Sequence, residues 1–227
     1  MMNIALFHQD AIDDQLIREI EKSHTIVSIE KKTPRTAVLE LKEALNIEQR
    51  THLRNLGVLH KTDVGFLPKH FKSSDIKVLA MDMDSTLINI ECIDEIADAV
   101  GKKNEVSEIT EAAMRGEITD YKESLRQRVA LLKGAPVSIM QRVFDEKLQL
   151  HPGAEKLVTT CLRSGLHTLL VSGGFDYFTQ RLQQQLGIHD TRSNQLEVKD
   201  GMFTGRLTPQ AWGDICDGEE KKRMVLQ

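Results

Sequence analysis

Hydrophobic residues in the first part of the chain follow two different periods. Apolar positions two apart, or in short continuous runs, predict strands, whereas apolar positions three and four apart predict helices. The expected strands cover residues 3–7, 25–30, 37–41 and 63–67, and the expected helices cover residues 10–22 and 47–56. We expect Gly57 to end the second helix. This order predicts a small ferredoxin-like α+β domain over residues 1–74, followed by a linker near residues 69–75.

The pattern changes after residue 75, where short apolar runs alternate with helical stretches. Residues 78–81 are a continuous apolar run, and Thr168 is followed by the apolar residues 169–171; both segments predict buried strands. Residues 154–162 and 175–186 carry apolar positions at helical spacing. Strands that alternate with helices are typical of an α/β domain with a parallel sheet. Near the end of the chain, Asp200-Gly201 between two alternating segments predicts a hairpin.

Composition narrows the class of protein. A chain of 227 residues with 40% hydrophobic residues can form one or two domains with a buried core. The formal net charge of −4 argues against non-specific binding of nucleic acid, which needs a basic surface. The sequence shows no signal-peptide pattern and no apolar run near the roughly 20 residues that span a bilayer. Three scattered cysteines favour a reducing compartment without disulfides, so we expect a cytoplasmic protein that binds neither nucleic acid nor membranes.

Two carboxylates, Asp82 and Asp84, directly follow the apolar run of residues 78–81. In an open α/β sheet, ligands bind just beyond the carboxyl ends of the strands. Like charges this close are costly unless a cation or a shared proton relieves the repulsion, and Mg²⁺ prefers oxygen ligands. One carboxylate could then act as a nucleophile and the other as an acid and base. The alternative is a solvated loop with two ordinary aspartates, but the preceding strand and the Ser-Thr-apolar sequence after the pair favour a site.

The segment Asp82-Met83-Asp84-Ser85-Thr86, followed by Glu91-Cys92-Ile93-Asp94-Glu95, resembles the first motif of the haloacid dehalogenase-like phosphatases, and within them the phosphoserine phosphatase family. The resemblance runs from about Lys77 to the C-terminus. It implies a doubly wound parallel sheet over residues 75–227, with a helical cap inserted at about residues 90–150. It also implies Mg²⁺-dependent hydrolysis of O-phosphoserine through an aspartyl-phosphate, the last step of serine biosynthesis.

The same resemblance implies roles for residues of the expected cap. Glu91 corresponds to a glutamate that contacts the substrate amino group, and Arg128 to an arginine that binds the substrate carboxylate. Arg126 is an alternative to Arg128, because residues two apart on a helix face different directions, and either arginine could simply lie on the surface. Met114 and Tyr121 correspond to apolar residues that shield the bound substrate, although ordinary packing would also explain them.

A second and a third motif follow in the core. In Ser172-Gly173-Gly174-Phe175, a hydroxyl and glycine amides at a strand-to-helix junction can hold a phosphate. The resemblance implies that Ser172 binds a phosphoryl oxygen and that Gly173 supplies a backbone amide. The third motif is a lysine that neutralises phosphoryl charge. Lys221 fits by its spacing from Asp217-Gly218, and Lys222 fits by its spacing to Leu226; we favour Lys221.

The resemblance makes Asp82 the nucleophile, Asp84 the acid and base, and both of them Mg²⁺ ligands, Asp84 through its backbone carbonyl. The fourth motif of the family, G-D-x-x-N-D, is absent, because no Asn-Asp follows Gly213-Asp214. We therefore expect a chain truncated before that motif, with an incomplete core and weak or no turnover.

Two questions stay open at this stage. The first domain is either a regulatory or dimerisation module, which could sense an amino acid and could form a homodimer, or a structural appendage without a ligand. The second question is the activity: besides hydrolysis of phosphoserine, the motifs allow a phosphatase or phosphotransferase for another small phosphomonoester, or a non-catalytic phosphate-binding fragment. In each case the expected partner is a small molecule.

Overall fold

The computed structural model describes residues 2–227, except for the side chains of Ser73 and Met114. The chain divides into two compact units, one up to Asp75 and one from Ile76 onward, and each is described by itself. No helix within the described residues is both long enough and apolar enough to cross a bilayer.

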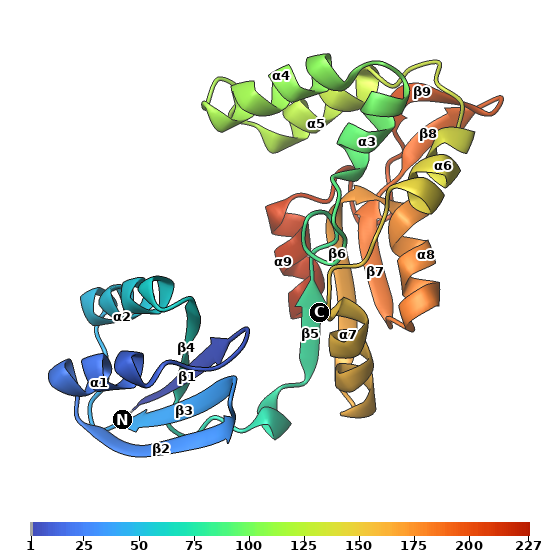
Figure 1. The fold of residues 1–227 in the computed structure, drawn as a ribbon. Coiled ribbons are helices and arrows are strands. Elements are labelled where there is room, and N and C mark those ends of the chain that lie inside the picture. Colours follow the sequence, from blue (N-terminus) through green and yellow to red (C-terminus); the bar gives the residue numbers. More distant parts are fainter. Residues whose placement is uncertain (1) are drawn as a thin grey trace. The chain divides into compact units, whose positions relative to one another are not determined.

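The first unit is a four-stranded antiparallel sheet with two helices on one face (Figure 1). Its elements are β1 (Met2–His8), α1 (Asp14–Ser23), β2 (Ile26–Thr33), β3 (Thr36–Leu41), α2 (Ile47–Leu59) and β4 (Thr62–Pro68). The sheet order is β2-β3-β1-β4, and Ile4 in the centre lies opposite Leu39 and Phe66. Alternate strand residues face the helices and form one buried cluster with them, which includes Ile4, Leu6, Leu16, Ile20, Leu39 and Leu53.

The helices of this unit begin at polar residues whose side chains accept backbone hydrogen bonds. Asp13 accepts from the Gln15 amide, and Asn46 and Gln49 form a reciprocal capping box at the start of α2. The expectation that Gly57 ends α2 is wrong, because the helix continues to Leu59.

Gly57 is required for a different reason, the close approach of α2 to β4. A Cβ atom at this position would lie 2.5 Å from the Thr62 carbonyl oxygen and 2.6 Å from Val64 Cγ2. Only a residue without a side chain allows the helix and the strand to pack at this distance.

The second unit is built on a parallel sheet in the order β5-β6-β7. Its strands are β5 (Val78–Met81), β6 (His167–Phe175) and β7 (Asp190–Asn194). The short helix η1 (Ser73–Asp75) is the last element of the first unit. The helices around this sheet are α7 (Ala154–Arg163), α8 (Asp176–Leu186) and α9 (Gly218–Leu226). The predicted α/β class with a parallel sheet is therefore confirmed.

Helices cover both faces of the central strand β6. Leu170 packs into the main cluster with Val158 of α7 and Phe178 of α8. The neighbouring residues on the strand, Leu169 and Val171, point to the opposite face, where they contact a cluster that includes Met224 of α9. Because successive strand residues alternate between faces, this arrangement places α9 on one side of the sheet and α7 and α8 on the other.

Four helices and a hairpin lie beyond the carboxyl edge of this sheet (Figure 1). The helices are α3 (Cys92–Ala99), α4 (Lys103–Met114), α5 (Tyr121–Ala130) and α6 (Ser138–Glu146), and the hairpin is β8 (Leu196–Lys199) with β9 (Met202–Leu207). Backbone hydrogen bonds join Phe203 of β9 to Gly134 and Ala135 in the segment between α5 and α6. The cap therefore contains residues 196–207 in addition to the inserted helices.

The tight packing of α2 on β4 gives a direct test. We expect Gly57→Ala to destabilise the first unit by about 1–3 kcal/mol, because the added methyl overpacks the contact. Alanine is otherwise favoured over glycine in a helix interior by about 1 kcal/mol, so a net destabilisation means that the overpacking outweighs this gain. Hydrogen exchange of the β1 and β4 amides would measure the change. Val58→Ala is the matched control, because Val58 is 76% exposed and its truncation is expected to change stability by less than about 0.5 kcal/mol; equal protection in both variants would contradict the account.

Candidate active site

Asp82 is the first residue after β5, at the carboxyl edge of the parallel sheet. Its Oδ1 accepts a hydrogen bond from the Met83 amide at 2.8 Å, and its Oδ2 accepts one from Lys221 Nζ at 2.6 Å. Met83 itself is fully buried, and its carbonyl accepts from the amides of Leu87 and Ile88, so the turn after β5 is tightly fixed. Asp82 thus points out of the sheet edge with an ammonium group as its partner.

Asp84 is held by donors from two different elements. Its Oδ1 accepts from the Cys92 amide at the start of α3 at 2.9 Å, and its Oδ2 accepts from Ser172 Oγ at 3.1 Å. Burial raises the pKa of Asp84 above its ordinary value, and the negative charge of Asp82 adds to the rise, whereas the hydrogen bonds from Cys92 and Ser172 oppose it. Asp84 therefore keeps a proton to a higher pH than a solvated aspartate.

The segment Ser172-Gly173-Gly174-Phe175 is the end of β6, and α8 begins directly after it. Ser172 is fully buried, and its Oγ accepts from the Gly174 amide at 2.9 Å while it donates to Asp84. A Cβ at Gly174 would lie 2.5 Å from Asp84 Oδ2. A glycine here lets the strand end approach the acid pair.

Lys221 reaches Asp82 from α9. Asp217 caps this helix, because its side chain accepts from the Glu220 amide at 2.9 Å. Glu220 is buried and pairs with Arg223 of the same helix and with Arg192 of β7. The pair with Arg192 holds the helix against the sheet. The structure thus brings Lys221, and not Lys222, to the acid pair; Lys222 is exposed.

Residues of the cap close the same pocket from the other side. The cavity has a volume of about 230 Å³. Its lining combines core and cap residues: Asp82, Asp84, Glu91, Ile93, Tyr121, Leu125, Arg128, Gly173, Gly174, Phe175 and Lys221. Ser172 lies directly behind this surface, in contact with Asp84. The structure therefore brings together all seven residues that the sequence analysis favoured for the site: Asp82, Asp84, Glu91, Arg128, Ser172, Gly173 and Lys221. The side chain of Met114 lies outside the described part of the chain.

Glu91 and Arg128 enter the pocket in fixed orientations. Ser85, which has a left-handed backbone conformation with φ of 51°, donates its hydroxyl to Glu91 Oε1 at 2.7 Å. Burial raises the pKa of Glu91, and the nearby charge of Asp84 contributes to the rise. Arg128 donates its Nε to the Ser124 carbonyl at 3.3 Å. Tyr121 also lines the pocket, and burial raises the pKa of its hydroxyl to about 12.

Arg126, the alternative to Arg128, has a different partner. Its Nη2 lies 2.6 Å from Asp214 Oδ2, and Lys122 Nζ lies 3.0 Å from Asp214 Oδ1. These pairs join α5 of the cap to the segment before α9. The hydrogen bond from Lys122 holds the pKa of Asp214 below its ordinary value. Sequence patterns did not reveal them, because the partners lie 88 and 92 residues apart.

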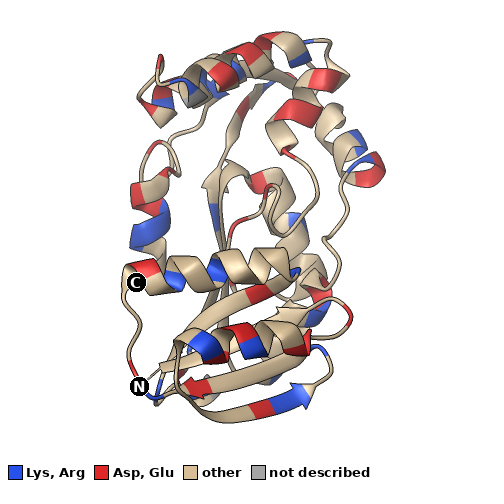
Figure 2. Cartoon of the chain, turned by 60° about the vertical axis from the view of Figure 1, so that its left-hand side comes forward, with Lys and Arg blue, Asp and Glu red and all other residues tan. Residues whose placement is uncertain are grey.

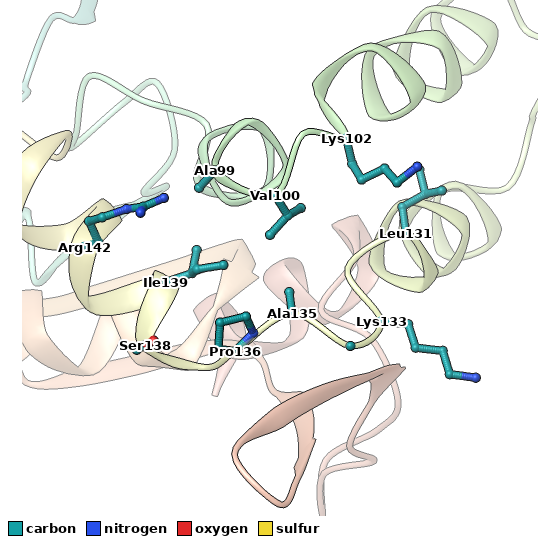
Figure 3. Close-up of a pocket in the computed structure, with 11 residues that line it drawn as sticks. Ala99, Val100, Lys102, Leu131, Lys133, Ala135, Pro136, Ser138, Ile139 and Arg142 are labelled. Atoms are coloured by element: carbon teal, nitrogen blue, oxygen red, sulfur yellow. The ribbon is translucent and has the colours of Figure 1, made fainter.

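The cap also contains a larger cavity, of about 560 Å³, shown in Figure 3. Ala99, Val100 and Ile139 face its interior, and basic residues such as Lys102 and Arg142 lie at its margin. It shares no lining residue with the pocket of the acid pair and is lined by no carboxylate. Cavity size therefore does not identify the site, because the larger cavity lies away from the acid pair. Surface charge does not identify it either, because basic and acidic residues are interspersed along the helices of both units (Figure 2).

The donor set can be tested for its fit to a metal. Asp82 and Asp84 offer only oxygen atoms, and the described residues contain no cluster of three or more histidine, cysteine, aspartate or glutamate side chains that could hold an ion. Mg²⁺ is commonly bound by one or two carboxylates together with water and a substrate phosphate. The residues present fit Mg²⁺ in that mode.

A parallel sheet with an Asp-x-Asp pair, a Ser-Gly loop and a lysine at its carboxyl edge, under a helical cap, defines a class of capped α/β hydrolases. The family model described as "haloacid dehalogenase-like hydrolase" matches residues 79–227, and the chain belongs to this family.

Similar proteins carry a more specific name. A protein from Polaromonas sp. (strain JS666 / ATCC BAA-500) named "Phosphoserine phosphatase" is 65% identical over 156 residues, which cover 69% of this chain and 66% of the relative. A probable phosphoserine phosphatase from Vibrio cholerae, solved in an unliganded form, matches 99% of this chain and 67% of its own with a TM-score of 0.75 and 30% identity. A solved "Phospho-Aspartyl Intermediate Analogue of Phosphoserine phosphatase" matches 58% of this chain and 62% of its own with a TM-score of 0.54 and 38% identity.

The raised pKa of Asp84 gives a pH-dependent prediction. A carboxyl whose pKa is raised by folding lowers stability when it is ionised, so the penalty is absent below the ordinary pKa of aspartate and present at neutral pH. We expect Asp84→Asn without Mg²⁺ to raise Tm at pH 7 by a few degrees, since about 1 kcal/mol shifts Tm by about 2–4 °C for a chain of this size. The difference from the wild type should shrink as the pH falls below about 4.

Thermal unfolding between pH 3 and pH 8 in the presence of a chelator would measure this difference. Asp98→Asn is the control, because Asp98 is on α3 in the same unit and its side chain is 45% exposed. An Asp84→Asn variant that is less stable than the wild type at pH 7 would contradict the electrostatic account.

Proposed function

We propose that the chain hydrolyses O-phosphoserine to serine and phosphate in a Mg²⁺-dependent reaction. The observation that carries this proposal is the pocket itself, whose lining combines the acid pair and Lys221 of the core with Glu91 and Arg128 of the cap. The names of the similar proteins support the same substrate. Since the product is serine, the reaction would be the last step of serine biosynthesis.

The two ends of the pocket suit the two ends of phosphoserine. At the cap end, the carboxylate of Glu91 is a partner for the ammonium group, and the planar guanidinium of Arg128 is a partner for the carboxylate. At the core end, the Ser172 hydroxyl, the Gly173 amide and Lys221 would bind the phosphoryl oxygens. The small volume of about 230 Å³ favours a small monoester over a larger phosphorylated compound.

In the first step, an oxygen of Asp82 attacks phosphorus and forms an aspartyl-phosphate, while Asp84 gives its proton to the leaving serine oxygen. The raised pKa of Asp84 keeps this proton available. In the second step, ionised Asp84 takes a proton from a water molecule that attacks the aspartyl-phosphate, which releases phosphate and restores Asp82. Lys221 balances the negative charge beside Asp82 throughout.

Asp82 and the backbone carbonyl of Asp84 would hold Mg²⁺. When bound, the ion supplies positive charge that stabilises the phosphoryl oxygens. The chain's own residues orient the ester, exclude water through the cap and move the proton at Asp84.

The nucleophile can be tested by substitution. We expect Asp82→Asn to reduce phosphate release from phosphoserine by at least about 10³-fold, because the amide cannot form the covalent intermediate. Acid quenching during turnover followed by mass spectrometry should show a phosphorylated peptide at Asp82 in the wild type alone. Asp98→Asn should retain turnover; a full rate in Asp82→Asn would remove Asp82 as the nucleophile.

Selectivity can be tested at Arg128. We expect Arg128→Ala to lower kcat/KM for phosphoserine about 10–100-fold, because a charged hydrogen bond to the carboxylate is lost, and to leave hydrolysis of an aryl phosphate nearly unchanged. Arg126→Ala is the matched control, since Arg126 binds Asp214 outside the pocket; it should change both substrates alike. An equal loss on both substrates in Arg128→Ala would argue against a carboxylate clamp and in favour of another phosphomonoester.

A further inference from the structure

Asn194 is a buried amide that none of the steps above uses. It is the last residue of β7 and is 1% exposed. Its Nδ2 donates to the Gly173 carbonyl oxygen at 2.7 Å, and its Oδ1 accepts from the Cys216 amide at 2.8 Å. One planar group therefore joins the end of β6 to the segment before α9, at two residues that are 43 apart in sequence.

Each of these two segments adjoins a residue that the proposed function assigns to the phosphate. Gly173 follows Ser172, whose hydroxyl contacts Asp84. Cys216 precedes Asp217, which caps α9, and the next turn of that helix carries Lys221 to Asp82. The distance between the end of β6 and the lysine helix is thus set in part by the length of one asparagine side chain.

The chemistry of the position requires an amide. Asparagine carries a donating nitrogen and an accepting oxygen on one rigid group, and each of these atoms makes a hydrogen bond here. An aspartate of the same shape has no donor for the Gly173 carbonyl and would set a carboxylate against it. The Gly173 carbonyl would keep only the longer hydrogen bond from the Tyr121 hydroxyl at 3.5 Å. Loss of its short, buried partner is costly, so the end of β6 would shift.

We propose that Asn194 is a positioning residue for the phosphoryl group: it holds the end of β6 and the base of α9 at the separation that lets Ser172, the Gly173 amide and Lys221 bind one phosphate together. This inference rests on the proposed function of the pocket as a phosphate site. Asn194 does not line the pocket, and neither of its two hydrogen bonds involves Glu91 or Arg128. Its loss should therefore affect the phosphate end and spare the end that binds an amino acid.

Two probes separate these ends. Inorganic phosphate with Mg²⁺ and, separately, L-serine are titrated into the wild-type chain and into Asn194→Asp by calorimetry. We expect Asn194→Asp to weaken the binding of phosphate about tenfold or more and to change the affinity for L-serine by less than about twofold. Asn194→Ser, which keeps a small polar group, is the second variant, measured in the same way in case the carboxylate prevents folding; far-UV circular dichroism checks the fold of each.

Ser193→Ala is the matched control. Ser193 is the preceding residue of β7 and is 8% exposed, and its hydroxyl is bonded to Thr179 of α8 at 2.8 Å, away from both segments. This variant also loses a buried hydrogen bond from the same strand, but it should bind phosphate like the wild type.

The outcomes distinguish the two proposals. If the wild type binds phosphate and a folded Asn194 variant binds it equally well, the positioning role is overturned while the proposed function stands. If an Asn194 variant loses phosphate and L-serine equally, or if Ser193→Ala weakens phosphate as much, the effect is general destabilisation and the role is also overturned. A wild-type chain that binds no phosphate would overturn the proposed function and this inference with it.

Discussion

The placement of two carboxylates, Asp82 and the buried Asp84, at one edge of the sheet is the constraint that the rest of the second unit satisfies. Asp82 is met by the Lys221 ammonium at 2.6 Å, and Asp84 by the Ser172 hydroxyl at 3.1 Å and the Cys92 amide at 2.9 Å. These partners come from α9, from the end of β6 and from the start of α3, so the acid pair fixes where three separate elements must lie.

The core and the cap contribute different residues to the pocket but share one hydrophobic interior. The main buried cluster runs from Met83 and Phe178 in the core to Leu125 and Val129 in α5. Ion pairs from α5 to Asp214 add a polar link between the same parts. The parallel sheet thus supplies the reactive groups at its carboxyl edge, whereas the cap supplies Glu91 and Arg128, which would decide which monoester is accepted.

Local patterns in the sequence predicted much of this arrangement. Asp82, Asp84 and Ser172 follow apolar strands directly, and strand ends of a parallel sheet meet at one edge, so their proximity could be inferred. Pattern alone could not choose between Arg126 and Arg128, because the rotation of α5 is set by its packing on the hairpin and the core. The same holds for Gly57, whose role depends on a contact with β4, and for Asn194, whose partners are distant along the chain. Such tertiary contacts leave no local period.

The most direct test of the central claim is a crystal structure of the chain with Mg²⁺ and beryllium fluoride, which mimics a phosphoryl group on a carboxylate. The account predicts an adduct on an Asp82 oxygen, with the fluorine atoms contacted by Ser172 Oγ, the Gly173 amide and Lys221 Nζ. An adduct on Asp84, or one on Asp82 that lies away from Ser172 and Lys221, would contradict it.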